Sequence, residues 1–235
     1  MEKLTNTITL PISQKAVTIR EGDGYSDKIL LKKNKKLYET YPEYLASLIV
    51  DIDGKERIKK KDVLDLFAPD QEYLAIECYK LNYGTDFRFL FICPACEHEE
   101  EHVVDLEKLE FKELPVEFQS TDPVVEGKLP RSGKRVTIGM LNGHQESLLL
   151  EQIIAGPVVD TNQAAFQAIR FIDGSRDFSY EDVINFVQAD LREIRRLRKK
   201  LLCGYDTEVV VKCSDCGEKS SINLMTSRDF LLPEG

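Results

Sequence analysis

The sequence predicts an α+β protein built as a tandem duplication of one unit, and three observations lead to this prediction. Short segments recur in the same order about 120 positions apart. Each copy contains one Cys-x-x-Cys motif, CPAC at 93–96 and CSDC at 213–216. Each copy also combines segments of strand period with segments of helical period. The predicted unit is β–α–α–α–β-knuckle-β, with zinc-ribbon-like hairpins and a pseudo-twofold axis relating the two copies.

Length and composition are those of a soluble globular protein. The chain has 235 residues, of which 42% are hydrophobic and 31% charged, enough for two cores of about 100 residues each. The N-terminus lacks the features of a signal peptide, so we expect a reducing compartment. The six cysteines are then expected to be thiols or metal ligands, not disulfides. A net charge of −9 argues against a general nucleic-acid binder.

The internal repeat rests on an ordered series of matches. LPISQKAVTI at 10–19 matches LPRSGKRVTI at 129–138, and IDGKERIKKKDV at 52–63 matches IDGSRDFSYEDV at 172–183. Single residues also match in the same register, namely Asp70 with Asp190, Gly84 with Gly204 and Asp86 with Asp206. The predicted domains are a first repeat over 1–118, a linker over 119–128 and a second repeat over 129–235.

Each copy is expected to contain the same elements. A strand (KAVTI, KRVTI) is followed by a helix over YPEYLASLIVDI at 41–52 or TNQAAFQAIRFI at 161–172. Asp62 and Asp182 are expected to cap the next helices, and Asp70 is expected to cap a third, with Asp190 beginning its counterpart. Gly84 and Gly204 are expected to end these helices. Strands then lead into the cysteines, and HVVDL and SSINL return from them.

The two Cys-x-x-Cys motifs predict one structural metal site. Two thiolates at a tight turn supply half of a tetrahedral site, so a four-ligand zinc requires both copies. The predicted ligands are Cys93, Cys96, Cys213 and Cys216. Such an ion would join the two repeats, because its binding energy becomes folding energy. Iron is an alternative metal for four thiolates.

Other interpretations of the cysteines remain open at this point. Separate sites could be completed by other ligands, with His98 and His102 as the nearby candidates in the first copy. The thiols could instead be reduced and free of metal. A redox role is less favoured, because redox Cys-x-x-Cys motifs normally begin a helix. Cys78 and Cys203 do not match each other in the repeat and are expected to be core or boundary thiols.

A basic segment, LREIRRLRKK at 191–200, is the candidate partner surface. Its candidate contact residues are Arg192, Arg195, Arg196 and Lys199. A solvated helix face, an acidic protein partner and nucleic acid are the three interpretations, in decreasing order. No catalytic motif occurs, since the sequence lacks a nucleophile elbow, a P-loop, a Rossmann glycine pattern and a zinc-protease helix. The chain is therefore expected not to be an enzyme.

The ordered motifs resemble a known family. The LP-x-S-x-K-x-V openings, Tyr83-Gly84 before the CPAC knuckle, the terminal CSDC and the ending FLLP are together similar to baseplate hub assembly proteins, or tail assembly chaperones, of contractile-tailed, myovirus-type bacteriophages. The resemblance covers nearly the whole chain. The first opening lacks the glycine of LPRSGK, and the ending is less aromatic than the family pattern.

The resemblance implies a non-enzymatic structural or assembly role in a tail baseplate hub. It implies other hub and tail proteins as partners, and it leaves a homo-oligomer open. It places the protein in the host bacterial cytoplasm during assembly, and in the virion baseplate if the protein remains in the tail. No membrane is implied. The alternative function is a nucleic-acid-binding zinc protein that uses the basic segment 192–200.

Overall fold

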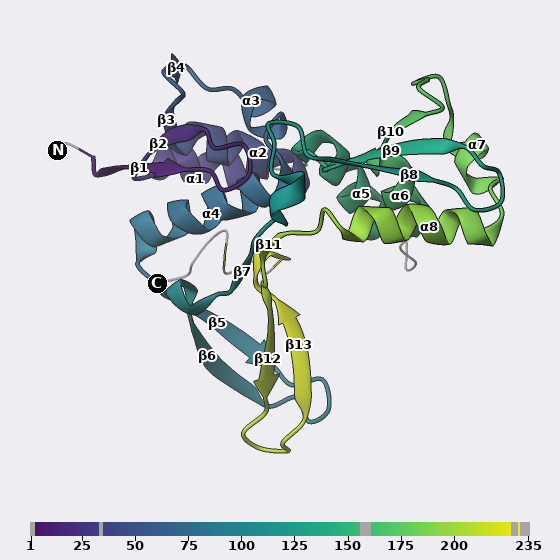
Figure 1. The fold of residues 1–235 in the computed structure, drawn as a ribbon. Coiled ribbons are helices and arrows are strands. Elements are labelled where there is room, and N and C mark those ends of the chain that lie inside the picture. The colour runs from purple at the N-terminus through teal and green to yellow at the C-terminus, as the bar shows by residue number, and fades with distance from the viewer. Residues whose placement is uncertain (1–2, 33–34, 156–160, 227–229, 231–235) are drawn as a thin grey trace.

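The computed structural model describes residues 3–32, 35–155, 161–226 and 230 (Figure 1). Helices and small antiparallel sheets are mixed along the described residues, which confirms the predicted α+β class. Two bodies lie side by side, and two hairpins extend from them (Figure 1). Within the described residues, we find no helix with the length and apolar character that crossing a membrane requires.

The first body is a four-stranded sheet, in the order β1-β2-β3-β4, packed with four helices. Its strands are β1 Thr5–Thr9, β2 Ala16–Arg20, β3 Ile49–Ile52 and β4 Lys55–Glu56. Its helices are α1 Gly24–Leu30, α2 Leu37–Leu48, α3 Lys60–Leu64 and α4 Ala68–Tyr83. The strand β2 alternates buried and less buried residues, so that Val17 and Ile19 enter the core.

The second body is a three-stranded sheet, in the order β10-β9-β8, again packed with helices. Its strands are β8 Val124–Lys128, β9 Arg135–Gly139 and β10 Ile169–Ile172. Its helices are α5 Gly143–Ala155, α6 Thr161–Ala168, α7 Tyr180–Ile184 and α8 Gln188–Lys199. The helix α8 buries Leu191, Ile194 and Leu197 along one face, as its apolar period predicts.

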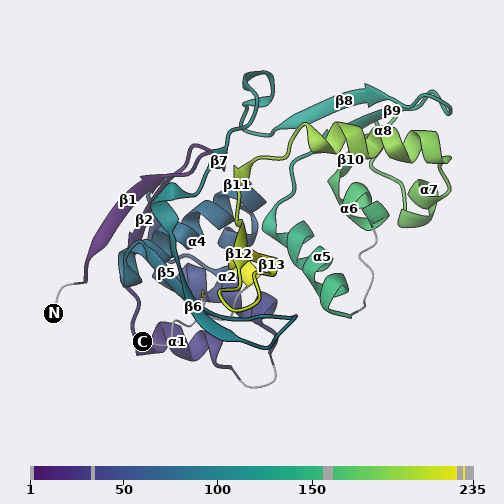
Figure 2. The same ribbon diagram turned by 90° about the horizontal axis from the view of Figure 1, so that it is seen from below.

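Two hairpins carry the cysteine motifs. They consist of β5 Asp86–Ile92 with β6 Glu99–Asp105, and of β12 Glu208–Lys212 with β13 Lys219–Asn223. The segments between hairpins and bodies meet as β7 Phe111–Lys112 and β11 Gly204–Tyr205, an antiparallel pair. Short 3-10 turns follow, at η1 Leu106–Lys108, η2 Val116–Phe118 and η3 Leu224–Thr226. Seen from below, the second hairpin crosses beside the first (Figure 2).

The apolar residues form two cores, and the hairpins share one of them. The first core contains the inner residues of the first body together with Phe87, Phe89 and Phe91 of β5. Val211 of β12 and Leu224 of η3 are buried in that same core. The second core joins β8 to β10 with α6 to α8. The last described part of the chain therefore packs on the first body.

Two predicted helices end earlier in the sequence than expected. Both expected helices, 41–52 and 161–172, end four residues early, at Leu48 and Ala168, and become the strands β3 and β10. The helix predicted over 41–52 is therefore wrong from Ile49 onward, since Ile49 begins a strand and faces Ile19 of β2. A four-residue apolar segment fits both periods, and sheet pairing decides the outcome.

The predicted capping roles of three aspartates also need correction. Asp62 and Asp182 are not the cap residues themselves; they occupy the third helical position, behind caps at Lys59 and Ser179. Asp70 lies within the first turn of α4 and does not cap it, because its carboxylate binds a distant loop.

Of the two glycines expected to end helices, one does so and the other does not. Gly84 is the residue after α4, with φ +87°, as predicted. Gly204 does not end α8, which stops at Lys199, and it lies in β11 instead.

Part of the predicted linker is also structured, because Val124–Lys128 forms β8 and pairs with β9.

Candidate metal centre

The first knuckle is positioned by β5. Alternation along this strand points Phe87, Phe89 and Phe91 inward, and Cys93 continues the same side, with its side chain fully buried. The turn is closed by two backbone hydrogen bonds, in which Cys93 N donates to His98 O at 2.9 Å and Glu97 N donates to Cys93 O at 2.9 Å. Cys96 therefore returns toward Cys93.

The second knuckle has the same backbone geometry. Cys213 N donates to Glu218 O at 2.8 Å, and Gly217 N donates to Cys213 O at 3.0 Å. Gly217 has φ +77°, and its counterpart Glu97 adopts the same left-handed conformation with φ +60°. The departure from glycine at Glu97 therefore leaves the turn geometry unchanged.

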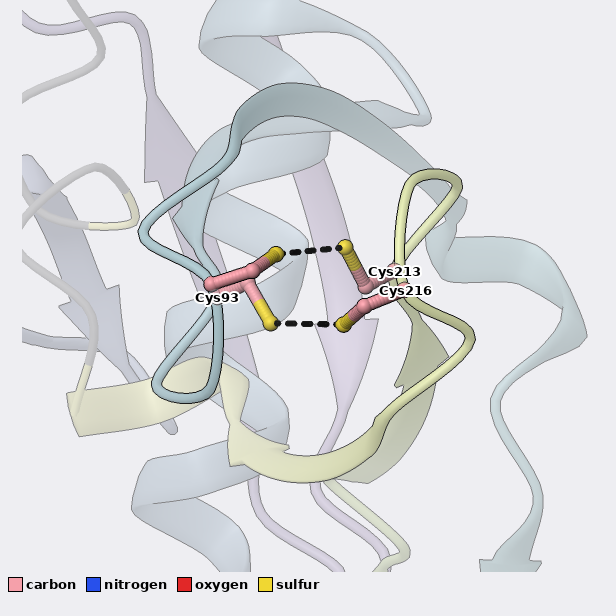
Figure 3. Close-up of side chains that lie close together, drawn as sticks. Cys93, Cys213 and Cys216 are labelled. Atoms are coloured by element: carbon pink, nitrogen blue, oxygen red, sulfur yellow. Dashed lines mark hydrogen bonds between the residues drawn. The ribbon is translucent and has the colours of Figure 1, made fainter.

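The two knuckles face each other across a four-sulfur cluster (Figure 3). The Sγ atoms of Cys93 and Cys216 lie 3.6 Å apart, and so do those of Cys96 and Cys213. All four Sγ atoms lie within 4.8 Å of one another. Four sulfurs bound at 2.3 Å in a tetrahedron would be about 3.8 Å apart, whereas a disulfide needs about 2.05 Å. The spacing fits a four-thiolate metal site.

The thiols of the cluster differ in pKa. Burial acts to raise the pKa of Cys93, but the N–H donors of Ala95 and Cys96, together with hydrogen bonds from the thiols of Cys216 and Cys96, outweigh it and lower that pKa to about 7. The N–H of His98 acts to lower the pKa of Cys96, and contacts with the other thiols raise it to about 12. Four thiolates this close repel one another, so full ionisation requires a bound cation.

The nearby histidines make other contacts. His98 Nε2 lies 3.3 Å from the Ser214 hydroxyl, across the two knuckles. The ring of His102 stacks on Phe89 and meets Phe91 edge on. The four sulfurs thus come together without either histidine. Ser214 N also donates to Glu100 Oε1 at 3.0 Å, which is a second bond between the hairpins that sequence reasoning did not anticipate.

The other two cysteines lie apart from the cluster. Cys78 is buried in α4 within the first core, and burial raises the pKa of its thiol well above the usual range. Cys203 is half-buried between α8 and β11, where burial raises its thiol pKa to about 11. Their positions are those of core and boundary thiols.

The four candidate partner residues do not behave as one free basic patch. The guanidinium of Arg196 is paired with Glu193 at 2.6 Å, and Arg195 donates to Asn162 Oδ1 at 3.3 Å. Arg192 and Lys199 are exposed on α8. Arg195 and Arg196 thus make contacts within the chain, and a partner contact by any of the four residues stays a prediction.

Comparison with known proteins gives one result. The family described as T4 bacteriophage base plate protein matches residues 1–232 of the 235. We found no match among curated proteins or among solved structures. The match spans both bodies and both knuckles, and it agrees with the resemblance that the ordered motifs indicate. The chain therefore belongs to the family of T4 bacteriophage base plate proteins.

Proposed function

We propose that this chain is a non-enzymatic structural and assembly protein of a phage tail baseplate hub, in which one zinc ion joins two repeats. The single observation that carries the proposal is the meeting of two knuckles, 120 positions apart in sequence, at tetrahedral sulfur spacing. Membership in a baseplate family supports the structural role.

Zinc is the metal that the donor set favours. Cys93, Cys96, Cys213 and Cys216 would supply four thiolates and leave no open position, as in structural rather than catalytic zinc sites. Iron binds the same donor set and is the alternative. Because neither hairpin supplies four ligands alone, metal binding would also hold the two hairpins together.

The duplication is supported by matching contacts in the two bodies. Val17 pairs with Ile52 across β2 and β3, and Val136 pairs with Ile172 across β9 and β10. Both pairs of strands contain an irregularity at the same place, just after the helix ends. We propose units of residues 1–118 and 119–235, with the strand β8 assigned to the second and the knuckles related by a local pseudo-twofold axis.

A second set of contacts supports the same conclusion. Asp53 Oδ1 accepts from Ala16 N at 2.8 Å, and Asp173 Oδ1 accepts from Arg135 N at 2.8 Å. Asp53 and its counterpart Asp173 also have positive φ, at +49° and +51°. Each aspartate begins the Asp-Gly turn that the sequence repeats.

Family membership and the arrangement of surfaces support the proposed hub role. The proposed metal site lies between the two hairpins. It therefore leaves the outer faces of the two bodies available to other hub and tail proteins. We propose that this binding takes place in the host bacterial cytoplasm and that the chain belongs to the virion baseplate. Arg192 and Lys199 offer a small basic surface for an acidic partner. A nucleic-acid function, the alternative, would need the same surface.

Metal analysis tests the shared four-cysteine metal site. We expect one zinc per chain in purified protein, and loss of that zinc in Cys213→Ser. The melting temperature should fall by about 10 °C or more, since each kcal/mol shifts it by about 2–4 °C at this size. Cys203→Ser is the matched control and should retain the metal. An unchanged metal content in Cys213→Ser would refute the shared site.

Co-purification tests the hub role. The tagged chain, expressed with the other baseplate proteins, should capture hub proteins at physiological salt. The variant Arg192→Glu with Lys199→Glu should weaken capture if the basic surface contributes. Salt-dependent DNA or RNA binding by the wild type, lost in that variant, would instead favour the nucleic-acid function. A chain that captures no tail protein contradicts the proposal.

A further inference from the structure

A pocket of about 440 Å³ lies between the two bodies, away from the cysteine cluster. Its walls come from α2 and α4 of the first body, from α5 and the end of β9 in the second, and from the segment that follows α8. Among the lining residues are Tyr41, Met140, Leu141, Leu202 and Tyr205. The volume lies within the range of ligand sites, and the lining combines apolar walls with a few charged groups.

Two carboxylates and one guanidinium face this pocket. Glu72 on α4 accepts from Tyr205 N at 3.1 Å. Glu146 on α5 and Arg198 on α8 also line the pocket. Among the residues that the structure describes, no hydrogen bond or ion pair within 4 Å involves the side chain of Glu146 or Arg198. The charge of Arg198 nevertheless acts to lower the pKa of Glu146, whereas no cation acts on Glu72. The pocket therefore holds one cationic group for two carboxyl groups, and Glu72 is the one without a cation.

This arrangement is costly unless something completes it. A carboxylate withdrawn from water without a paired cation is destabilised. The pKa shifts agree with the geometry, because burial raises the pKa of Glu72 to about 7 and also raises that of Glu146. The repulsion between Glu146 and Glu72 acts in the same direction. A positive charge placed between the two side chains would reverse both effects.

We propose that this pocket receives a lysine or arginine side chain from a segment of a neighbouring tail protein. The cationic group would lie between Glu72 and Glu146, and its methylene stem would pack on the apolar walls. The rings of Tyr41 and Tyr205 suit such a stem and its charge. This inference rests on the proposed assembly function.

The chemistry of the pocket favours a side chain over a metal ion. Hard divalent cations need six or more oxygen ligands or retained water, and a largely apolar pocket offers neither. A cation on a long apolar stem matches both the carboxylates and the walls. The net charge of −9 would also draw a basic segment toward the chain.

A small probe tests the pocket itself. N-acetyl-arginine amide should bind the zinc-loaded chain and shift the amide resonances of Gly143 and Tyr205 in NMR titrations. Its neutral isostere, N-acetyl-citrulline amide, should bind at least tenfold more weakly. Glu72→Gln with Glu146→Gln should raise the Kd for the arginine probe at least tenfold. Glu117→Gln with Glu208→Gln, on the exposed surface, should leave it unchanged.

Two outcomes of this titration would overturn the inference. Equal binding of the two probes would show that charge is not recognised. An unchanged Kd in Glu72→Gln with Glu146→Gln would show that these carboxylates do not bind the probe. A circular dichroism spectrum and zinc content equal to the wild type confirm that the variant is folded.

Capture of baseplate proteins tests the partner. The variant Glu72→Gln with Glu146→Gln should lose one hub protein that the wild type captures, and restoring either glutamate should recover part of it. If the variant loses the probe but retains every partner, the docking inference is overturned and the assembly function stands. If the wild type captures no tail protein, the assembly function and the docking inference both fail, whatever the probe does.

Discussion

Two buried aspartates hold equivalent loops against equivalent helices. The carboxylate of Asp70 accepts from Ile12 N at 2.8 Å and Ser13 N at 3.0 Å. The carboxylate of Asp190 accepts from Arg131 N at 2.8 Å and Ser132 N at 3.0 Å. Both side chains are almost fully buried, at 0% and 1% exposed. The matched LP-x-S segments and the matched aspartates are therefore one contact, made twice.

Replacing either aspartate with asparagine should destabilise the protein. The amide keeps one acceptor oxygen but turns an N–H₂ toward the second backbone N–H. We expect Asp70→Asn and Asp190→Asn each to reduce the free energy of unfolding by about 1–3 kcal/mol in urea titrations. Asp177→Asn, on the exposed surface, is the control. A loss no larger than that of the control would show that these bonds contribute little.

Glu97 should make its knuckle turn less stable than the equivalent turn at Gly217. A non-glycine residue at positive φ costs about 1–2 kcal/mol, and Gly217 avoids this cost at the equivalent place. Glu97→Gly should therefore raise the free energy of unfolding by up to about 1 kcal/mol. Gly217→Ala should lower it by a similar amount. Thermal melts of the zinc-loaded chain measure both, and a fall in stability in Glu97→Gly would contradict the argument.

Sequence patterns located the cysteines but not the charged pocket. The four cysteines are found because a rare residue recurs in the same motif 120 positions apart. Glu72 and Glu146 have no such signal, since glutamates are common on helices and their meeting depends on how two bodies pack. Asp70 was visible as a matched residue, but its loop partner lies 58 positions away. Spacing identifies such residues, whereas their contacts require the fold.

At the scale of elements, the strands that directly follow a helix in the sequence were the hardest to predict. The strands β3 and β10 follow their helices directly, without a glycine or proline to mark the change. The strand β8 was hidden for a different reason, because Pro123 precedes it and Gly127 lies within it. Turn-like composition indicates a loop, yet pairing with β9 imposes a strand. Long strands that lead to the cysteines were predicted correctly.

The helices α3 and α7 offer a matched test of capping. Ser179 Oγ accepts from Asp182 N at 3.2 Å, and Asp182 Oδ2 accepts from Ser179 N at 2.7 Å. In α3 only the second bond is present, from Lys59 N to Asp62 at 2.9 Å, because a lysine side chain cannot accept. The helix α3 therefore has half of this capping box.

Completing the capping box of α3 should stabilise the first body. Lys59→Ser should raise the free energy of unfolding by about 1 kcal/mol, and Ser179→Ala should lower it by about 1 kcal/mol. Lys59→Ala supplies no acceptor and should change little, which separates capping from loss of the lysine. Urea titrations measure all three. Equal effects of Lys59→Ser and Lys59→Ala would rule out the cap as the cause.

At the scale of the whole molecule, the second hairpin returns from the second body and packs on the first body. The second hairpin leaves the second body through β11, pairs there with β7, and buries Val211 and Leu224 in the first core. Tyr205 of β11 stacks on Tyr73 of α4, and Phe111 of β7 meets both rings edge on. This return could not be predicted from local patterns, because it depends on contacts between residues more than 90 positions apart. It is also what brings the two knuckles together.

Glu72 makes this return dependent on pH. Its carboxylate accepts from Tyr205 N at 3.1 Å, at the point where the chain comes back to α4. Burial raises the pKa of Glu72 from 4.5 to about 7 in the folded protein, against the effect of hydrogen bonds from Tyr205 and Thr207. The folded state then binds more protons than the unfolded state between these values. Stability must therefore fall as pH rises from about 4.5 through 7.

The size of this effect can be measured with glutamine variants. For the zinc-loaded chain we expect Glu72 to account for a loss on the order of 2 kcal/mol between pH 5 and pH 8. Glu72→Gln removes the titration and should flatten the curve by that amount, and it should be more stable than the wild type at pH 8. Glu146 acts in the same direction, so Glu146→Gln should flatten it further. Urea titrations at each pH, with Glu208→Gln as the exposed control, measure the differences. A wild-type curve that rises over this range and keeps its slope in Glu72→Gln would mean that the Glu72 carboxylate is already ionised and compensated in the folded chain.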